Sequence, residues 1–515
     1  MTLLSASMFV DDLAELPQRA ASAFAAGADA LELRIDGFEG DPAALARFLK
    51  SQPSRKYVVT CRSAEQGGSF RGDTMQRVAL LIAVARDTGA WVDFEWADWQ
   101  RSANIRQKVL LACAAEGTEA PRLILSHHDL SGVPADSRNL ITEMRKEGAI
   151  AKLAFRARDA NDGFVALDLL HEFGAGVIAV AMGEGGLFTR VLAPKCGAWG
   201  TYAALTAETP TAPGQCTIAQ MVSQFRFPQI GPRTQVYGVI GDPIAHSLSP
   251  LLHNVWFSNY GIDAVYLPCL VHAEPEGLIR FLDGCFARPW LNIAGFSITA
   301  PHKEAALRWA GARADRLSQS LGAANTLVWS ANGIRAHNTD AHAAVDALAA
   351  ALNMESTALR RFSVDILGAG GTGRALAITL AGLGCKVTIF DRKLERSEQV
   401  AQAAGGVGSL FSEASNGKGD ILINATALGA ESSKDGVPPE LVAQRRLVFD
   451  VNYRPARTAY VRAAEAAGVP AMNGIDMFLR QAATQFALWT GVEPDMNLGR
   501  NVVQQALAAD EEAKS

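Results

Sequence analysis

A lysine and a pair of histidines in the first half of the chain have the chemistry of amine and acid–base catalysis. Lys152 lies in the apolar run AIAKLAF, where scarce water disfavours the ammonium form. A neutral amine attacks a ketone to give an iminium, which acidifies the adjacent carbon. His127 and His128 end the run PRLILSHH, and histidine transfers protons near neutral pH. Taken singly, a lysine that reaches solvent and a surface histidine are the commoner explanations.

Side chains that bind anions and hydroxyls occur in other motifs of the same half. Glu32, Arg34 and Asp36 alternate with apolar residues in ALELRID, so a strand would place all three on one face. The turn MGEGGLFTR supplies Arg190, and TAPGQ supplies a hydroxyl and an amide. These groups suit a carboxylate and hydroxyls. A half-exposed edge strand would alternate in the same way, so each motif is weak alone.

Hydroxyl, amine and carboxylate groups follow predicted strands in the second half. Ser247 and Ser249 follow a strand and a glycine turn in YGVIGDPIAHSLSP, so both hydroxyls could face one cavity. Lys303 in GFSITAPHKEAA and Asp340 in HNTDA, if brought together, would relay the proton that accompanies hydride transfer. A simple turn and a surface ion pair are the alternative explanations.

A glycine-rich turn predicts a dinucleotide site. Gly368, Gly370 and Gly373 form G-x-G-x-x-G between the strand VDIL and the helical pattern RALAITLAGLG, with Gly371 inside the turn. In that context the backbone and the start of the helix bind a pyrophosphate.

The cofactor is selected at the end of the next strand, KVTIF. Asp391 there suits the ribose hydroxyls of NAD, whereas Arg392 suits the additional phosphate of NADP. Together with Lys393 and Arg396, the basic residues outweigh one acid and favour NADP over NAD.

The elements that would position these groups alternate between strands and helices. From residue 1 to about 223, the runs ALELRID, KYVVTCR, WVDFEW, PRLILSHH, AIAKLAF, GVIAVAM and GTYAAL favour a closed (β/α)8 barrel, which presents catalytic groups at strand C-termini. The overall prediction is an α/β protein, in which the barrel precedes a two-domain enzyme with a Rossmann-type fold. The boundaries follow as a barrel at 1–223, a linker at 224–235, an α/β domain at 236–342 completed by 473–505, a nucleotide-binding domain at 343–472 and a frayed tail at 506–515.

Composition limits the classes of partner. The chain has 515 residues, of which 49% are hydrophobic and 20% charged, with a formal net charge of -5. This balance argues against nucleic acid, and no apolar run is long enough to span a membrane, so small molecules are the expected partners. The seven cysteines contain no C-x-x-C and predict neither a metal site nor disulfides. The start lacks a basic leader, so we expect a cytoplasmic protein. The oligomeric state is not indicated.

The motifs of the first half, in their order, closely resemble type I 3-dehydroquinate dehydratase over nearly all of residues 1–220. They are ELRxD, xRxxxxGG, SxHD, a strand lysine, MGxxGxxTR and APGQ. The resemblance implies that Lys152 forms a Schiff base with the C3 ketone and that His128 is the general acid and base. It also implies the residues that hold the hydroxyls and carboxylate of the substrate: Glu32, Arg34, Arg62, Arg190, Thr211 and Gln215.

One position departs from that family. The family usually has glutamate before the paired glycines, whereas RSAEQGG has Gln66 there and Glu65 one residue earlier. Gln66 is expected to orient His128 by hydrogen bonding, but it would not raise the pKa of the imidazole as a carboxylate would.

The second half resembles shikimate dehydrogenase over residues 236 to about 505. The motifs are GDPIAHSLSP, GFSITAPHKE, GAANT, NTD, GAGGTGR, INAT and NGIDMFLRQ. The resemblance implies that Lys303 and Asp340 are the catalytic pair. It also implies shikimate-binding residues, Ser247, Ser249, Thr299, Asn325, Tyr453 and Gln481, and adds Asn424 and Thr426 to the cofactor site.

The order of the two halves resembles the fused dehydratase–dehydrogenase of plants. We therefore expect dehydration of 3-dehydroquinate followed by reduction of 3-dehydroshikimate with NADPH. Two alternatives remain open: an NAD-dependent enzyme of quinate or shikimate catabolism, motivated by Asp391, and an inactive metabolite sensor, motivated by Gln66.

Overall fold

The computed structural model describes residues 1–113, 121–330, 333–426, 428 and 437–512. By the contacts within the chain it divides into two compact units. The first holds residues 1–238, 243–245 and 262–293, and the second holds 239–242, 246–261 and 294–515.

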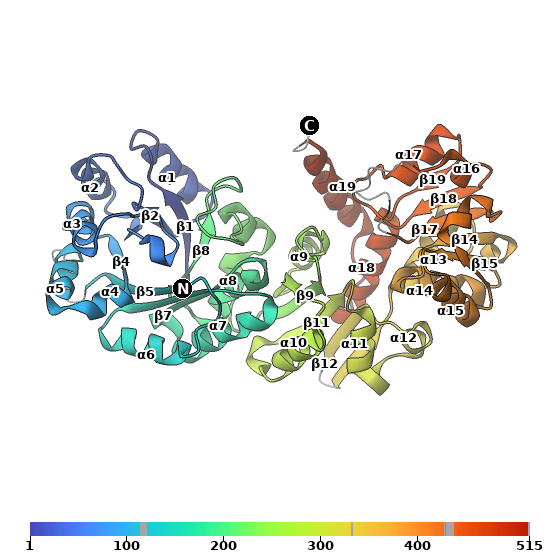
Figure 1. The fold of residues 1–515 in the computed structure, drawn as a ribbon, viewed down its shortest axis with the longest axis horizontal. Coiled ribbons are helices and arrows are strands. Elements are labelled where there is room, and N and C mark those ends of the chain that lie inside the picture. The colour runs from blue at the N-terminus through green and yellow to red at the C-terminus, as the bar shows by residue number, and fades with distance from the viewer. Residues whose placement is uncertain (114–120, 331–332, 427, 429–436, 513–515) are drawn as a thin grey trace. The chain divides into compact units, whose positions relative to one another are not determined.

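The first unit is built on an eight-stranded parallel barrel, and Figure 1 shows its helices around the strands. The strands lie in the order β7-β6-β5-β4-β3-β2-β1-β8. Trp199, just before β8, donates a backbone hydrogen bond to Val177 at the start of β7, which brings the two ends of the sheet together. The strands are β1 (Leu3–Phe9), β2 (Ala30–Arg34), β3 (Lys56–Thr60), β4 (Trp91–Glu95), β5 (Leu123–Asp129), β6 (Ile150–Arg156), β7 (Val177–Met182) and β8 (Gly200–Ala204).

Helices α1 to α8 follow the strands of the barrel along the chain. They are α1 (Leu16–Ala25), α2 (Pro42–Lys50), α3 (Thr74–Ala85), α4 (Trp96–Arg101), α5 (Ala103–Ala112), α6 (Ser137–Lys146), α7 (Ala160–Phe173) and α8 (Leu187–Val191). Local signals begin several of them: Asp73 and Gln76 form a capping box at α3, and the Asp159 carboxylate caps α7. Every residue of β2, β7 and β8 is buried, as expected for strands with a packed interior and helices outside.

The second sheet of the chain has five strands in the order β10-β9-β11-β12-β13, and β12 runs antiparallel to both β11 and β13. Its strands are β9 (Gln235–Gly241), β10 (Ala264–Leu270), β11 (Ile293–Ile298), β12 (Thr326–Ser330) and β13 (Gly333–His337). The helices between and after them are α9 (Ser249–Asn259), α10 (Gly277–Phe286), α11 (Lys303–Ala310), α12 (Arg316–Leu321) and α13 (Asp340–Ala351).

The third sheet is parallel throughout, with six strands in the order β16-β15-β14-β17-β18-β19. Its strands are β14 (Ser363–Leu367), β15 (Lys386–Asp391), β16 (Val407–Leu410), β17 (Ile421–Asn424), β18 (Leu447–Asp450) and β19 (Ala471–Met472). The helices are α14 (Gly371–Gly382), α15 (Leu394–Ala404), α16 (Pro439–Val442) and α17 (Ala459–Ala466), and the chain continues into α18 (Ile475–Thr490) and α19 (Met496–Glu512). Strand order reverses at β14, where a doubly wound sheet binds its nucleotide.

One strand was not foreseen, and one expectation about the elements was wrong. The run LLSASMF at the start of the chain, which we did not count as a strand, is β1. The tail predicted to fray from residue 506 is helical up to Glu512, because α19 buries Val503 and Leu507 and Asp510 pairs with Arg454. Residues 513–515 lie outside the described part of the chain.

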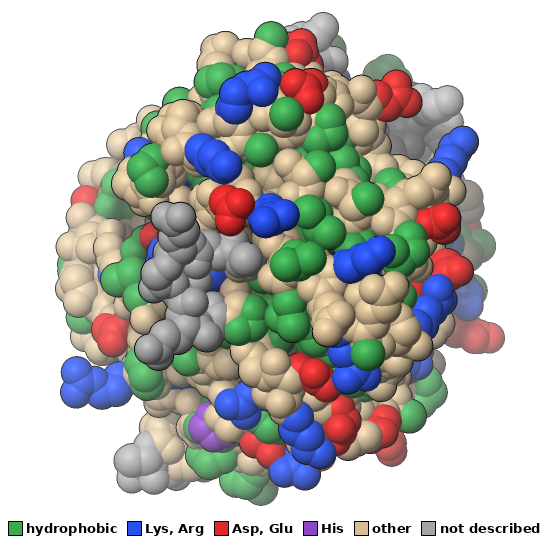
Figure 2. Space-filling model, turned by 90° about the vertical axis from the view of Figure 1, so that its left-hand side faces the viewer, with side chains coloured by type: hydrophobic (Ala, Val, Ile, Leu, Met, Phe, Trp, Pro, Cys, Tyr) green, Lys and Arg blue, Asp and Glu red, His purple; other side chains and the backbone are tan. Residues whose placement is uncertain are grey.

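Surface charge is mixed on the face drawn in Figure 2, where basic and acidic side chains alternate with hydrophobic ones. This face therefore offers no broad basic patch for an anionic ligand. No helix within the described residues is both long and apolar enough to cross a membrane.

Candidate active sites

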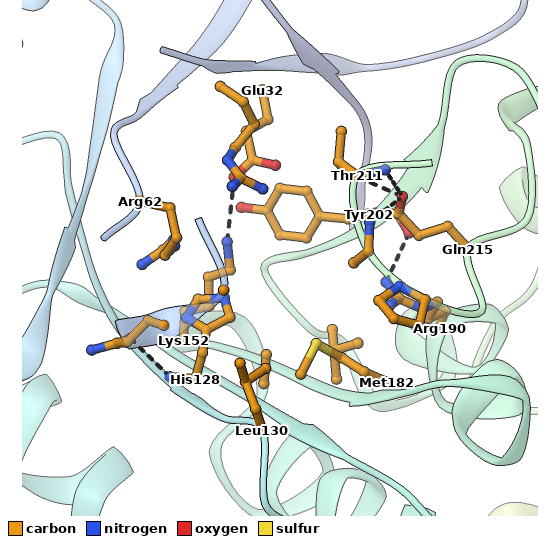
Figure 3. Close-up of a pocket in the computed structure, with 17 residues that line it drawn as sticks. Glu32, Arg62, His128, Leu130, Lys152, Met182, Arg190, Tyr202, Thr211 and Gln215 are labelled. Carbon is orange, nitrogen blue, oxygen red and sulfur yellow. Dashed lines mark hydrogen bonds and ion pairs between the residues drawn. The ribbon is translucent and has the colours of Figure 1, made fainter. Parts of the chain in front are cut away.

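A cavity in the barrel collects the residues predicted for the first half (Figure 3). Its empty volume is about 630 Å³, within the range of small-molecule pockets. Most of the lining residues come from the C-terminal ends of strands or from the loops that follow them, as in other barrels of this type. The cavity is lined by all nine residues that were predicted there: Glu32, Arg34, Arg62, Gln66, His128, Lys152, Arg190, Thr211 and Gln215.

The amine of Lys152 is buried but not in apolar surroundings. Its Nζ lies 2.8 Å from Oδ2 of Asp93 and 3.4 Å from Oε1 of Glu32, and it stands 4.1 Å from the centre of the Tyr202 ring. The expectation of an apolar environment, drawn from AIAKLAF, is therefore wrong. Ala151 and Leu153, the residues on either side of Lys152, face the opposite side of β6, whereas Lys152 lines the cavity with Ala154 and meets charges from other strands.

Asp93 is a member of this site that the sequence reasoning missed. Its Oδ1 accepts from Arg62, at 2.7 Å, and from the Ser126 hydroxyl, at 2.6 Å, while Oδ2 faces Lys152. Burial by itself raises the pKa of Asp93, but Arg62 and Lys152 outweigh burial and hold the pKa below its usual value. The alternation of Asp93 and Glu95 in WVDFEW was the signal that could have revealed both, since it places them on one face of β4.

His128 faces the cavity with a free ring nitrogen. Within the described part of the chain, its Nδ1 has no hydrogen-bond partner although it is shielded from solvent. Burial, Arg62 and Lys152 all disfavour the imidazolium, so the pKa of His128 lies well below 6.5. Gln66 contacts the histidine at another atom than expected: its Oε1 accepts from the backbone N–H of His128, at 3.0 Å. Gln66 thus orients the main chain and leaves the ring neutral.

Glu32 and Arg34 are both restrained before any ligand binds. Glu32 accepts from the hydroxyls of Ser7 and Thr60, and the bond from Thr60 is 2.9 Å. Burial raises the pKa of Glu32, but Lys152 and Arg34 outweigh it, so the net shift is downward. Arg34 makes a bidentate pair with Asp36, at 2.8 and 2.9 Å. Glu32 therefore remains an ionised acceptor for hydroxyls.

Arg190 is the buried cation of the cavity that lacks a counter-charge. It is 2% exposed, NH1 donates to the Tyr202 carbonyl at 3.2 Å, and Nε has no partner among the described residues. Burial lowers its pKa to about 10. No carboxylate in the described part of the chain forms an ion pair with it, so a ligand carboxylate would satisfy it. Beside it, the Gln215 amide oxygen accepts from Thr211 N and Oγ1, at 2.9 and 3.2 Å, which orders the loop.

The second unit brings Lys303 and Asp340 together. Each is the first residue of a helix, α11 or α13, and Nζ lies 2.7 Å from Oδ2. The side chains are 17% and 11% exposed, so this pair is not the surface contact that we held as the alternative. A turn fixes Asp340, because the Asn325 amide binds Thr339 twice, at 2.9 and 2.8 Å.

The remaining residues predicted for shikimate are spread over several elements. Ser247 precedes α9 and accepts from the backbone of Ser249, at 3.3 Å, and Thr299 follows β11. Tyr453 packs against Phe478 of α18, with ring centres 4.8 Å apart and the ring planes tilted by 31°.

Two glutamines of α18 have different roles. Gln481 donates to the Phe478 carbonyl of its own helix, at 3.0 Å. Gln485, which sequence reasoning missed, binds Ser297 at 2.7 Å and Thr326 at 3.0 Å and so attaches α18 to β11 and β12. No pattern in NGIDMFLRQAATQ distinguished it from a surface glutamine.

The glycine turn that leads into α14 has the geometry of a phosphate-binding loop. Gly368 has φ +97°, and a Cβ on Gly373 would lie 1.9 Å from the Gly368 carbonyl oxygen. Both positions therefore require glycine. A Cβ on Gly370 or Gly371 would meet nothing within 4 Å, which leaves open space above the start of the helix. These residues fit a dinucleotide pyrophosphate.

The acidic and basic residues that would choose between NAD and NADP differ in whether they already have partners. Both carboxylate oxygens of Asp391 already accept backbone hydrogen bonds, from Ala369 at 2.9 Å and from Lys393 at 3.0 Å. Arg392, Lys393 and Arg396 are exposed, and within the described residues none forms an ion pair. The geometry favours a cofactor with the additional phosphate.

Asn424 at the end of β17 and Thr426 in the loop after it are joined by a hydrogen bond. Asn424 is fully buried, and its side chain binds Thr426, Asp450 and the Leu428 carbonyl. It therefore supports the loop rather than facing a ligand. Among the described residues, no group of three or more His, Cys, Asp or Glu side chains could hold a metal ion.

Comparison with known proteins decides the family. The chain is 30% identical over 512 residues to the "Bifunctional 3-dehydroquinate dehydratase/shikimate dehydrogenase, chloroplastic" of Arabidopsis thaliana, covering 95% of this chain and 82% of that protein. The chain belongs to this bifunctional family. Residues 5–232 match the family Type I 3-dehydroquinase, residues 239–327 the shikimate dehydrogenase substrate binding domain, and residues 474–507 the shikimate 5'-dehydrogenase C-terminal domain.

Relatives of the dehydrogenase half alone are also found. The "Shikimate dehydrogenase (NADP(+))" of Methanocella arvoryzae is 36% identical over 279 residues, or 53% of this chain and 99% of that protein. A solved shikimate dehydrogenase of Thermus thermophilus is 30% identical, with a TM-score of 0.47, over 53% of this chain and 99% of that one. The predicted family, fold class and enzyme character are confirmed.

Proposed function

We propose that the dehydratase half converts 3-dehydroquinate to 3-dehydroshikimate through an iminium at Lys152, and that the dehydrogenase half reduces this ketone to shikimate with NADPH. The observation that carries the proposal is the barrel cavity. It places a buried amine, a neutral imidazole and the unpaired guanidinium of Arg190 around one space. A ketone that bears a carboxylate and hydroxyls satisfies all three.

In the dehydratase half, the Arg190 guanidinium binds the substrate carboxylate and Glu32 accepts from its hydroxyls. The Lys152 amine adds to the C3 ketone and expels water, leaving an iminium that acidifies C2. The neutral ring of His128 then removes the proton from C2 and returns it to the departing C1 hydroxyl, which leaves as a second water. Hydrolysis of the iminium consumes one water and frees Lys152, so one water is lost per substrate.

In the dehydrogenase half, Gly368, Gly370, Gly371 and Gly373 would hold the pyrophosphate, while Arg392, Lys393 and Arg396 would hold the additional phosphate. The cofactor supplies a hydride when bound. Lys303 and Asp340 hold the proton that the reduced carbonyl oxygen acquires, and their 2.7 Å ion pair fixes the position of both side chains. Ser247, Ser249, Thr299, Asn325, Tyr453 and Gln481 would bind shikimate.

The domain division at 1–223, 224–235, 236–342 with 473–505, and 343–472 is part of the proposal. Residues 1–223 contain β1 to β8, and residues 343–472 contain β14 to β19, which supports it. We also propose that the protein works in the cytoplasm, where thiols stay reduced. All seven cysteines are free.

A sequential absorbance assay tests the proposal. The protein is mixed with 3-dehydroquinate, the ultraviolet absorbance of the enone is followed, and NADPH is then added. Lys152→Met should abolish the enone signal and leave no 3-dehydroshikimate for the second step, but this variant should still oxidise NADPH when 3-dehydroshikimate is supplied. Lys303→Ala should keep the enone signal and lose the oxidation of NADPH. Repeating the reverse reaction with shikimate, quinate, NADP and NAD identifies the preferred pair. Absence of both signals in the wild-type protein would overturn the proposal.

A further inference from the structure

Tyr202 of β8 is a polar residue of the barrel cavity that the proposed mechanism does not use. The residue is 5% exposed and lines the cavity, and its hydroxyl oxygen is buried without a hydrogen-bond partner among the described residues. Most buried hydroxyls in proteins are paired, and an unpaired one costs free energy. The free hydroxyl therefore indicates a partner that arrives with the ligand.

The Tyr202 ring lies against the reacting amine. Nζ of Lys152 stands 4.1 Å from the centre of the Tyr202 ring, and Figure 3 shows the hydroxyl pointing toward Lys152 and Glu32. A substrate carbon bonded to Nζ would thus lie beside the tyrosine. The ring itself covers one side of the amine and leaves the remaining space for the substrate.

The arginines near the amine already donate hydrogen bonds to other side chains of the protein. Arg62 donates to Asp93 and Ser126, and Arg34 donates to Asp36. Ionised carboxylates only accept hydrogen bonds, so Asp93 offers nothing to a substrate oxygen. The neutral hydroxyl of Tyr202 is a donor at this place that has no partner within the described residues.

We propose that Tyr202 is a substrate-contacting residue of the dehydratase half, whose hydroxyl hydrogen-bonds an oxygen of the substrate held at Lys152. The inference rests on the proposed function. It also makes Tyr202 a specificity residue, because a site built around a substrate oxygen rejects analogues that lack this oxygen and leave the protein donor unpaired.

The protonation state supports a donor role. Burial, Glu32 and Asp93 all disfavour the tyrosinate, so the pKa of Tyr202 lies well above 10. The hydroxyl therefore keeps its proton at neutral pH and acts as a hydrogen-bond donor, not as a proton-transfer acid.

Tyr202→Phe tests the proposal, because it removes only the hydroxyl and keeps the ring over Lys152. Tyr57→Phe is the matched control: Tyr57 is also buried in a barrel strand, but it packs against Phe24 and Phe48 of the outer helices. We expect Tyr202→Phe to lower kcat/KM for dehydration about threefold to tenfold, as for one lost neutral hydrogen bond. The kcat/KM for dehydration should stay at the wild-type level in Tyr57→Phe. The dehydrogenase activity should stay at the wild-type level in both variants.

A crystal structure of the wild-type protein, trapped with 3-dehydroquinate and borohydride, gives the direct readout. The proposal expects the Tyr202 hydroxyl within about 3 Å of a substrate oxygen. It is overturned if the hydroxyl binds only Glu32 in that adduct, or if Tyr202→Phe loses no more than Tyr57→Phe. These failures differ from failure of the proposed function, in which the wild-type protein neither dehydrates the substrate nor forms an adduct.

Discussion

Replacing Asp93 by asparagine removes the carboxylate that joins two buried cations of the barrel. Asp93 is completely buried, and the side chains of Lys152 and Arg62 are 6% and 3% exposed. The amide keeps the size of the side chain but brings an N–H group against one of the two cations. Lys152 would then lose its shortest ion pair, and Arg62 would keep only Ser126 and the more distant Glu95.

The size of the effect follows from this burial. Removing one partner of a buried ion pair costs about 3–5 kcal/mol of unfolding free energy, because a buried charge is left uncompensated. The pKa of Asp93 lies below its usual value, so the carboxylate stabilises the fold above about pH 4 and loses this effect as the pH falls further. The difference between wild type and Asp93→Asn should therefore shrink below about pH 4.

A matched variant separates stability from chemistry. Asp98 is also buried and pairs with Arg77 in the same unit, but it does not line the cavity. Both variants should lose dehydratase activity at lower urea concentrations than the wild type. Only Asp93→Asn should slow iminium formation at Lys152 in the folded protein. The reasoning is refuted if Asp93→Asn unfolds like the wild type, or if Asp98→Asn slows iminium formation equally.

Three further predictions concern other groups. Gln66→Glu keeps an oxygen that accepts from the His128 backbone N–H and adds a negative charge near the ring, so it should raise the pKa of His128. The acid limb of the pH profile of dehydration should then move to higher pH. An unchanged profile would contradict this prediction. Lys303→Ala should lower the kcat of the dehydrogenase about 10²- to 10⁴-fold, and any comparable loss of dehydratase activity would count against separate sites. Arg396→Ala should raise the KM for NADPH about tenfold in steady-state assays; an equal rise for NADH would speak against a phosphate clasp.

Local patterns predicted the strands that carry chemistry but not what surrounds each group. ALELRID and AIAKLAF are strands, as their apolar residues indicated. The environment of Lys152 could not be read from AIAKLAF, because its neighbours Asp93 and Glu32 come from other strands of the barrel. The apolar pattern of one strand indicates that its residues are buried. The charges around a buried residue come from other strands, which only the closed barrel brings together.

Other omissions have similar causes. The strand LLSASMF contains serines, and Ser7 points inward at Glu32, so its polar character concealed its place in the barrel. The sequence could not show whether Tyr202 lines the cavity or only packs in the core, because the cavity is formed by residues of several strands. For Gln66, the departure from the family motif was visible, but its contact with the His128 main chain required the structure.

The central claim is that Lys152 forms a covalent iminium with the substrate, and borohydride trapping followed by peptide mass analysis tests it most directly. With 3-dehydroquinate present, the account predicts one reduced adduct per chain, located on the peptide that contains Lys152 and absent in Lys152→Met. An adduct on another lysine, or dehydration that proceeds in Lys152→Met at the wild-type rate, would contradict it.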